Sequence, residues 1–210
     1  MTRPLQLPAA PDIHAVIRDA LDPVVRPLGY VGKRAGAAGW SLKEDGAKLF
    51  FKFHLHPKAK DPYAGGEFVI EFERTPGEGP GGTLSGRARF DQLLMPAELA
   101  TVVEHQNDVI ASLRRPPAGH VASYPESLRE TYLQFFDRQE TFPPGDLWLR
   151  YRTLDHVRGW LRLIAGVLPS VLGRARRLDP HVLYLGSEID LSADPLRPTN
   201  PLVITQKPVE

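Results

Sequence analysis

The sequence contains no cysteine, and this absence excludes disulfide frameworks, thiol nucleophiles and thiolate metal sites. It contains no apolar run near the ~18 residues that a membrane-spanning helix needs, and no basic segment leads into an apolar run at its start. The formal net charge is only +1, so no overall field favours nucleic acid or an anionic membrane. We therefore expect a cytoplasmic protein that does not associate with membranes.

The chain also lacks the short motifs of common enzyme classes. No G-x-S-x-G elbow is present, and the glycine-rich residues 79–86 have neither dinucleotide-binding spacing nor a βαβ context. The segment 29–33 ends in glycine and lysine, but it follows a predicted helix, whereas a phosphate loop follows a strand. No cofactor is expected, and catalysis is not the leading prediction.

What the sequence does contain is two neighbouring segments in which apolar and polar residues alternate. This period of two in residues 48–56 and 67–74 predicts two half-buried strands. One face carries Leu49, Phe51, Phe53, Leu55, Phe68, Ile70 and Phe72, and the other carries Lys48, Lys52, His54, His56, Glu67, Glu71 and Glu73. If the strands pair, one sheet face is an aromatic core and the other sets basic side chains against carboxylates.

Several other segments have helical periodicity. The first has its apolar stripe between Ile13 and Leu28, with Asp12 as the expected N-cap. A second helix is predicted to begin at Pro96, where proline suits the first turn, and another is predicted over residues 125–138. The last should be capped by Thr153 and broken or kinked at Pro169.

Short strands are predicted at residues 40–43, 87–90, 147–151 and 181–186, with a turn at 44–47 and a loop at 57–66. Strands and helices are segregated, which predicts an α+β fold with a mostly antiparallel sheet of four to six strands and helices packed on one face. Residues 1–191 are expected to form one domain. Prolines make residues 192–210 an extended tail.

The polar face of the two alternating segments is the predicted binding surface, because chemically useful side chains are densest there. Its candidate residues are Lys52, His54, His56, Glu71 and Glu73. The expected partner is a protein or a small molecule, and the chain itself is expected to be a monomer or a homodimer.

The same face allows an alternative, a metal-dependent hydrolase. His54 and His56 lie two residues apart, so their side chains share one face of a strand, and Glu71 or Glu73 could complete a metal site. The competing interpretation is a solvated face whose cross-strand pairs contribute ~0.2–1 kcal/mol each. Neighbouring glutamates also favour the imidazolium form, which weakens metal binding.

A second alternative is nucleic-acid binding. Trp148, Arg150 and Arg152 alternate on one predicted strand face and could form a stacking and charge platform. Other basic clusters are Lys58 with Lys60, Arg114 with Arg115, and residues 174–177. Two of these clusters end helices, where they complement the helix dipole, so nucleic acid is not the expected partner.

Two regions carry a family resemblance. The first is the segment 26–30, which reads Arg-Pro-Leu-Gly-Tyr after the first helix, followed by Lys33, Trp40 and the hairpin strands. The second is the segment 145–153 with Asp155, Val157, Trp160, Leu161 and the segment 168–172. Over roughly residues 12–175 the chain resembles an uncharacterised bacterial family of unknown function with an α+β fold. The resemblance implies a binding or immunity role near toxin or defence genes, and it supplies no catalytic residues.

Overall fold

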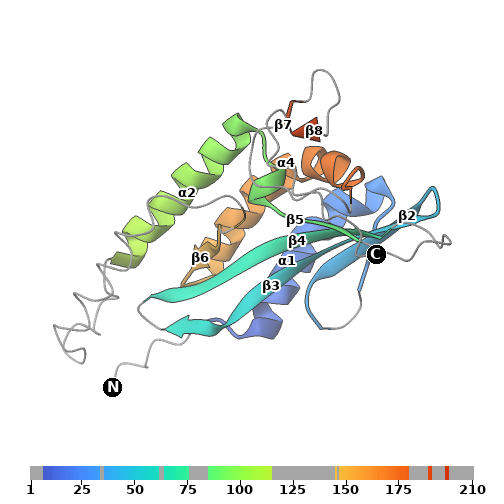
Figure 1. Cartoon of the computed structure of the whole chain (residues 1–210). Helices are drawn as coiled ribbons and strands as arrows, with labels where there is room; N and C mark the ends of the chain where they lie inside the picture. Colours follow the sequence, from blue (N-terminus) through green and yellow to red (C-terminus); the bar gives the residue numbers. More distant parts are fainter. Residues whose placement is uncertain are drawn as a thin grey trace, which may run out of the picture.

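An antiparallel sheet organises the chain in the computed structural model (Figure 1). The structure describes residues 7–33, 36–61, 64–75, 85–114, 145, 147–179, 189–190 and 197–198, with only the backbone for 58–61, 189–190 and 197–198. The sheet strands are β1 (Val31–Gly32), β2 (Gly39–Glu44), β3 (Ala47–Asp61), β4 (Gly65–Thr75), β5 (Gly86–Arg89) and β6 (Leu149–Tyr151). They run in the order β1-β2-β3-β4-β5, and β6 also pairs with β4.

Helices cover one face of this sheet. The described helices are α1 (Ala10–Val25), α2 (Pro96–Arg114) and α4 (Leu154–Ala175), with short 3-10 turns η1 (Arg26–Leu28) and η2 (Asp91–Leu93). Figure 1 shows α1 and α4 together on the same side of the sheet, while α2 lies beside β6 and α4. The predicted α+β fold, with an antiparallel sheet and helices packed on it, is confirmed.

The core lies between the sheet and these helices, where the predicted aromatic face is buried. Phe51, Phe53 and Phe68 have no exposed surface, and Phe72 is 1% exposed. The Phe51 ring stacks between those of Trp40 and Phe72, with ring centroids 5.0 and 5.6 Å apart, which adds to the hydrophobic stabilisation of the sheet. α1 contributes an apolar stripe at helical spacing to this core. Its buried residues are Ile13, Ile17, Leu21 and Val25.

The central hairpin is longer than the sequence predicted, so the expected loop at residues 57–66 is wrong. β3 continues to Asp61 and β4 begins at Gly65. The register shifts between Leu55 and Lys60, so Pro57 lies in an irregular stretch of the strand. Proline has no backbone N–H to donate, and such a stretch can accommodate it. Proline inside an edge or bulge is compatible with a strand, and here it did not end one.

Two helix predictions also need correction. α1 begins at Ala10 with Ala9 as its N-cap, and Asp12 lies in the first turn, where its carboxylate complements the helix dipole. Pro169 does not end α4, because buried side chains on both sides of it, Leu168 and Val171 among them, hold the helix against the core as far as Ala175. The predicted cap of α4 is confirmed, since the Thr153 side chain accepts a hydrogen bond from the backbone N–H of His156.

One edge of β4 pairs with two strands that are far apart in the sequence. β5 pairs with residues 71–74 of β4, and β6 pairs with residues 66–68. Since β3 occupies the other edge of β4 along its length, β5 and β6 follow each other along one edge. The helix predicted at residues 125–138, the strand at 181–186 and most of the tail at 192–210 lie outside the described residues. β7 (Ile189–Asp190), just before the predicted tail, pairs with β8 (Arg197–Pro198) inside it.

Candidate functional site

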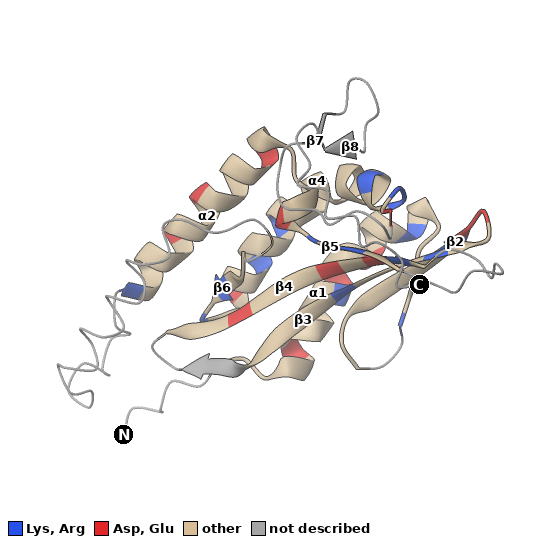
Figure 2. Cartoon of the chain, in the orientation of Figure 1, with Lys and Arg blue, Asp and Glu red and all other residues tan. Residues whose placement is uncertain are grey.

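The face of the sheet opposite the helices carries two cross-strand rows of polar residues. Strand register places Lys52, Glu71 and Arg89 opposite one another on β3, β4 and β5. The next row along the strands is formed by Phe50, Glu73 and Arg87. Figure 2 shows the acidic positions of β4 along the middle of the sheet. We name these two rows the charged ladder.

The ladder is held by ion pairs that are open to solvent. Lys52 Nζ lies 2.9 Å from Glu71 Oε2, with the side chains 40% and 35% exposed. Arg87 Nη2 lies 3.4 Å from Glu73 Oε1, and the Arg87 side chain is 74% exposed. Pairs of this exposure contribute only ~0–1 kcal/mol to folding. Folding therefore does not depend on them, and their charges are available to a ligand.

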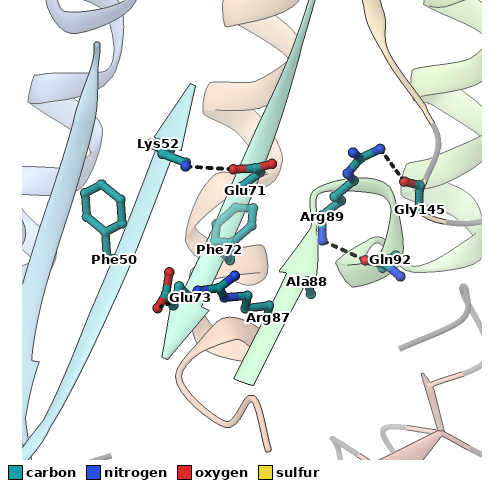
Figure 3. A pocket seen from close by; sticks show the side chains of 10 residues that line it. All are labelled: Phe50, Lys52, Glu71, Phe72, Glu73, Arg87, Ala88, Arg89, Gln92 and Gly145. Atoms are coloured by element: carbon teal, nitrogen blue, oxygen red, sulfur yellow. Dashed lines mark hydrogen bonds and ion pairs between the residues drawn. The ribbon is translucent and has the colours of Figure 1, made fainter. Parts of the chain in front are cut away.

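A pocket of about 390 Å³ lies on the charged ladder. Its volume falls within the range of small-molecule sites, roughly 300–1,000 Å³. Figure 3 shows how β3, β4, β5, η2 and Gly145 each contribute to its wall. The lining residues are Phe50, Lys52, Glu71, Phe72, Glu73, Arg87, Ala88, Arg89, Gln92 and Gly145.

One rim of the pocket is fixed by hydrogen bonds around Arg89. Its backbone N–H donates to Gln92 Oε1 at 2.7 Å, and its guanidinium donates to the Gly145 carbonyl at 2.6 Å (Figure 3). The guanidinium also lies over the Trp148 ring, 5.2 Å from its centroid. Gly145 has a φ of +83°, so a residue with a side chain would be strained there, and its Cβ would lie 2.9 Å from Gln92 Nε2.

A buried carboxylate helps to hold the same rim. Asp91 is 5% exposed, and its Oδ2 accepts the backbone N–H of Gly145 at 2.6 Å. Burial raises the pKa of Asp91, and the N–H of Gly145 opposes that rise because it stabilises the ionised form. Asp91 was not identified from the sequence. A lone aspartate after a short strand carries no signal that it will meet a glycine 54 residues away.

Cations extend beyond the pocket over the rest of this face. Lys33 Nζ lies 4.3 Å from the centroid of the Phe50 ring, and Lys43 faces Lys48 across β2 and β3. All three lysines are exposed. Glu67 forms an ion pair with Arg150, which leaves Glu71 and Glu73 as the glutamates that face these cations. Lysine and arginine side chains therefore outnumber glutamates on this face.

Of the predicted binding residues, the pocket gathers Lys52, Glu71 and Glu73 but not the two histidines. His54 and His56 lie farther along β3, with ring centroids 6.5 and 5.0 Å from that of Trp148. His54 is paired in register with Val69, an apolar residue that cannot bind a metal ion. Within the described part of the chain, no three His, Asp or Glu side chains form a group that could hold a metal ion.

The platform expected from Trp148, Arg150 and Arg152 is not open to a partner. Arg150 is 3% exposed, and its Nη2 lies 3.2 Å from Glu67 Oε2 across β6 and β4. Burial lowers the pKa of Arg150, while the Glu67 carboxylate opposes this. Arg152 is 7% exposed and donates to the Leu113 carbonyl at the end of α2. Arg174 is also buried and bonds to Glu98.

A serine and a histidine meet between α2 and α4 without forming a nucleophilic pair. Ser112 Oγ lies 3.3 Å from His156 Nε2, but His156 Nδ1 accepts the backbone N–H of Arg152 at 3.1 Å. In the neutral ring the proton is therefore on Nε2, which cannot accept one from serine. Burial lowers the pKa of His156, which favours that neutral ring. This pair is structural.

Comparison of the chain with protein-family models, with curated proteins and with solved structures finds no match. The resemblance to a bacterial family of unknown function thus remains a prediction. Among the described helices, none has both the length and the apolar character needed to cross a membrane. The site must therefore be interpreted from its geometry.

Proposed function

We propose that this protein is a non-catalytic binding module and that the charged ladder is its binding surface. The observation that carries the proposal is a pocket of ligand size whose wall contains both signs of charge on one open sheet face. The ion pairs of the ladder are half-exposed and contribute little to folding, so a ligand can replace them at small cost.

Binding is favoured over catalysis by the chemistry of the described side chains. A hydrolytic site needs a nucleophile beside a base, or a metal held by several ligands. The Ser112–His156 pair has the wrong proton arrangement, and His54, His56 and Glu71 are not gathered as ligands. The pocket itself contains lysine, arginine, glutamate and glutamine, which are suited to recognition by charge and hydrogen bonding.

Nucleic acid is a weaker fit than a protein or a small molecule. Phosphates that followed the lysines of β2 and β3 would meet Glu71 and Glu73 on the central strand. Two arginines that could have strengthened the case, Arg150 and Arg152, are buried in contacts within the fold. The expected role is thus recognition of a protein or a small molecule, as the family resemblance also implies.

The proposal can be tested by removing one ion pair from each side of the molecule. The first variant, Lys52→Ala with Glu71→Ala, removes a pair of the charged ladder without changing net charge. The matched control, Asp155→Ala with Arg158→Ala, removes an exposed pair of α4. Immobilised wild type and both variants are exposed to cell extract, and bound proteins and metabolites are identified by mass spectrometry.

We expect the control to retain what the wild type captures and the ladder variant to lose at least one species. That species should then bind purified wild-type protein in solution at a one-to-one ratio. Equal capture by all three proteins would contradict the proposal. So would a purified species that binds the ladder variant as tightly as it binds the wild type. Circular dichroism of each variant checks that the comparison is made between folded proteins.

A further inference from the structure

We propose that the pocket binds a small zwitterion, a molecule with a carboxylate at one point, an ammonium group at another and an apolar body. This inference rests on the proposed function, since it names the ligand class of the same pocket. It follows from the order of charges across the three strands.

The central strand is acidic and both of its neighbours are basic. Glu71 and Glu73 on β4 form the floor, with Lys52 on the β3 side and Arg87 and Arg89 on the β5 side (Figure 3). A cation placed over β4 faces carboxylates, whereas an anion placed over β3 or β5 faces ammonium or guanidinium groups. The strand spacing of ~4.8 Å sets the distance between the two kinds of position, which is short enough for one small molecule to reach both.

A ligand of a single charge suits this wall less well. A simple anion is attracted by Lys52 and Arg87 but is repelled by the glutamates between them. A simple cation is attracted by the glutamates but is repelled by the lysine and the arginines. The wall carries a formal charge of +1, from Lys52, Arg87 and Arg89 against Glu71 and Glu73. A zwitterion meets a partner of opposite charge at each end, and it pays only for displacing solvent-exposed ion pairs.

The two arginines on the β5 side are held differently, which assigns their roles. Arg89 is anchored by Gly145 and Trp148, so it is a positive charge in a fixed place. Arg87 is 74% exposed and held by one long ion pair, so it can turn toward a bound carboxylate. We expect the ligand's carboxylate on the β5 side and its ammonium group over Glu73.

Phe50 supplies the surface for the apolar body. Its ring is partly buried and belongs to the same cross-strand row as Glu73 and Arg87. Lys33 Nζ lies 4.3 Å from the centroid of the ring, and Phe50 itself lines the pocket. An aromatic or aliphatic group next to the ammonium end can therefore pack against Phe50.

Four probes that differ only in their end groups test this inference on the full-length protein. Phenylalanine is the zwitterion, N-acetylphenylalanine the anion, phenylalaninamide the cation and N-acetylphenylalaninamide the neutral control. Binding is followed by titration of the ¹H–¹⁵N spectrum. We expect phenylalanine to shift the amides of Glu71, Glu73 and Arg87 and to bind at least about tenfold more tightly than the other three, since each lost end removes a charge-assisted hydrogen bond.

One variant and its matched control then test the site of the ammonium group. Glu73→Gln keeps the shape and removes the negative charge, so phenylalanine should bind about tenfold more weakly while N-acetylphenylalanine does not weaken. Asp155→Asn, on exposed α4, should leave both unchanged. Equal affinity for phenylalanine and N-acetylphenylalanine, or no shift of pocket amides by any probe at millimolar concentration, would overturn the inference. If the extract capture still depends on Lys52 and Glu71, the proposed function stands and only the ligand class is wrong.

Discussion

Glu67 and Arg150 face each other across β4 and β6, with 3.2 Å between Glu67 Oε2 and Arg150 Nη2. Their side chains are only 13% and 4% exposed, so this pair differs from the solvent-exposed pairs of the charged ladder. It ties the segment after residue 145 to the edge of the central hairpin. A buried pair of this kind tolerates joint replacement better than the loss of one member.

Glu67→Ala should lower the free energy of unfolding by about 3 kcal/mol, because it leaves a buried guanidinium without its carboxylate. The double variant Glu67→Leu with Arg150→Met should recover most of that loss, since no charge is then left buried. Urea denaturation at pH 7 measures both. A loss below about 1 kcal/mol for Glu67→Ala would indicate that water solvates the pair.

The side chain of Gln106 forms hydrogen bonds with backbone groups of β6 and of the residue before it. Its side-chain amide donates to the Trp148 carbonyl at 2.8 Å and accepts the Arg150 N–H at 3.2 Å, and Gln106 has no exposed surface. Gln106→Leu should therefore destabilise the fold by about 1–3 kcal/mol, because two buried backbone groups lose their partners. Asn107→Leu, at the next and exposed position of α2, is the control and should change stability by less than about 0.5 kcal/mol.

His14 should make stability fall as the solution becomes acidic. Burial, and then the nearby Arg18, lower its pKa below the ordinary value of 6.5, and its Nδ1 accepts the Ala38 N–H at 3.2 Å. Because the folded pKa is below the unfolded one, the stability contributed by neutral His14 is present above pH 6.5 and is lost as pH falls through the folded pKa.

His14→Asn keeps an acceptor for the Ala38 N–H but cannot titrate in this range. Its stability should therefore fall less steeply than that of the wild type between pH 6.5 and pH 5, although His105 and His156, whose pKa values burial also lowers, still contribute a slope. Thermal melts over that range measure the difference. Identical slopes for the two proteins would show that His14 gains a proton without opposing the fold.

Gly66 makes room for a buried aromatic ring on β6. A Cβ at Gly66 would lie 2.5 Å from Tyr151 Cζ, and Tyr151 is 2% exposed. Gly66→Ala should therefore cost about 1–3 kcal/mol, since the ring must move out of a packed core. Gly173→Ala in α4 has open space at its Cβ and should instead stabilise the helix by about 0.5–1 kcal/mol. No loss of stability in Gly66→Ala would show that Tyr151 adapts without strain.

The fold was largely predictable because its local patterns agree with one another. Alternation in residues 48–56 and 67–74 predicted which side chains of β3 and β4 are buried, and Phe51 and Phe72 are in the core as expected. Helical periodicity predicted α1, α2 and α4. The errors concern Asp12, which lies in the first turn of α1 and not at its cap, Pro57, which an irregularity accommodates inside β3, and a break at Pro169, where buried neighbours continue α4.

The candidate site was predictable only in part. Lys52, Glu71 and Glu73 were expected on one polar face, and the register places all three in the pocket. Arg87, Arg89, Gln92 and Gly145 were missed, because β5 and the segment at residue 145 reach the same edge of β4 from distant parts of the chain.

The sequence by itself determined the two-sided character of the central strands, because a period of two is set by backbone geometry at each residue. Only the tertiary structure decided which polar side chains meet. Register between strands and the packing of β6 beside β4 separate an exposed pair such as Lys52–Glu71 from a buried one such as Glu67–Arg150, although Glu67 and Glu71 lie on the same face of β4. Those choices depend on long-range packing, which no local pattern encodes.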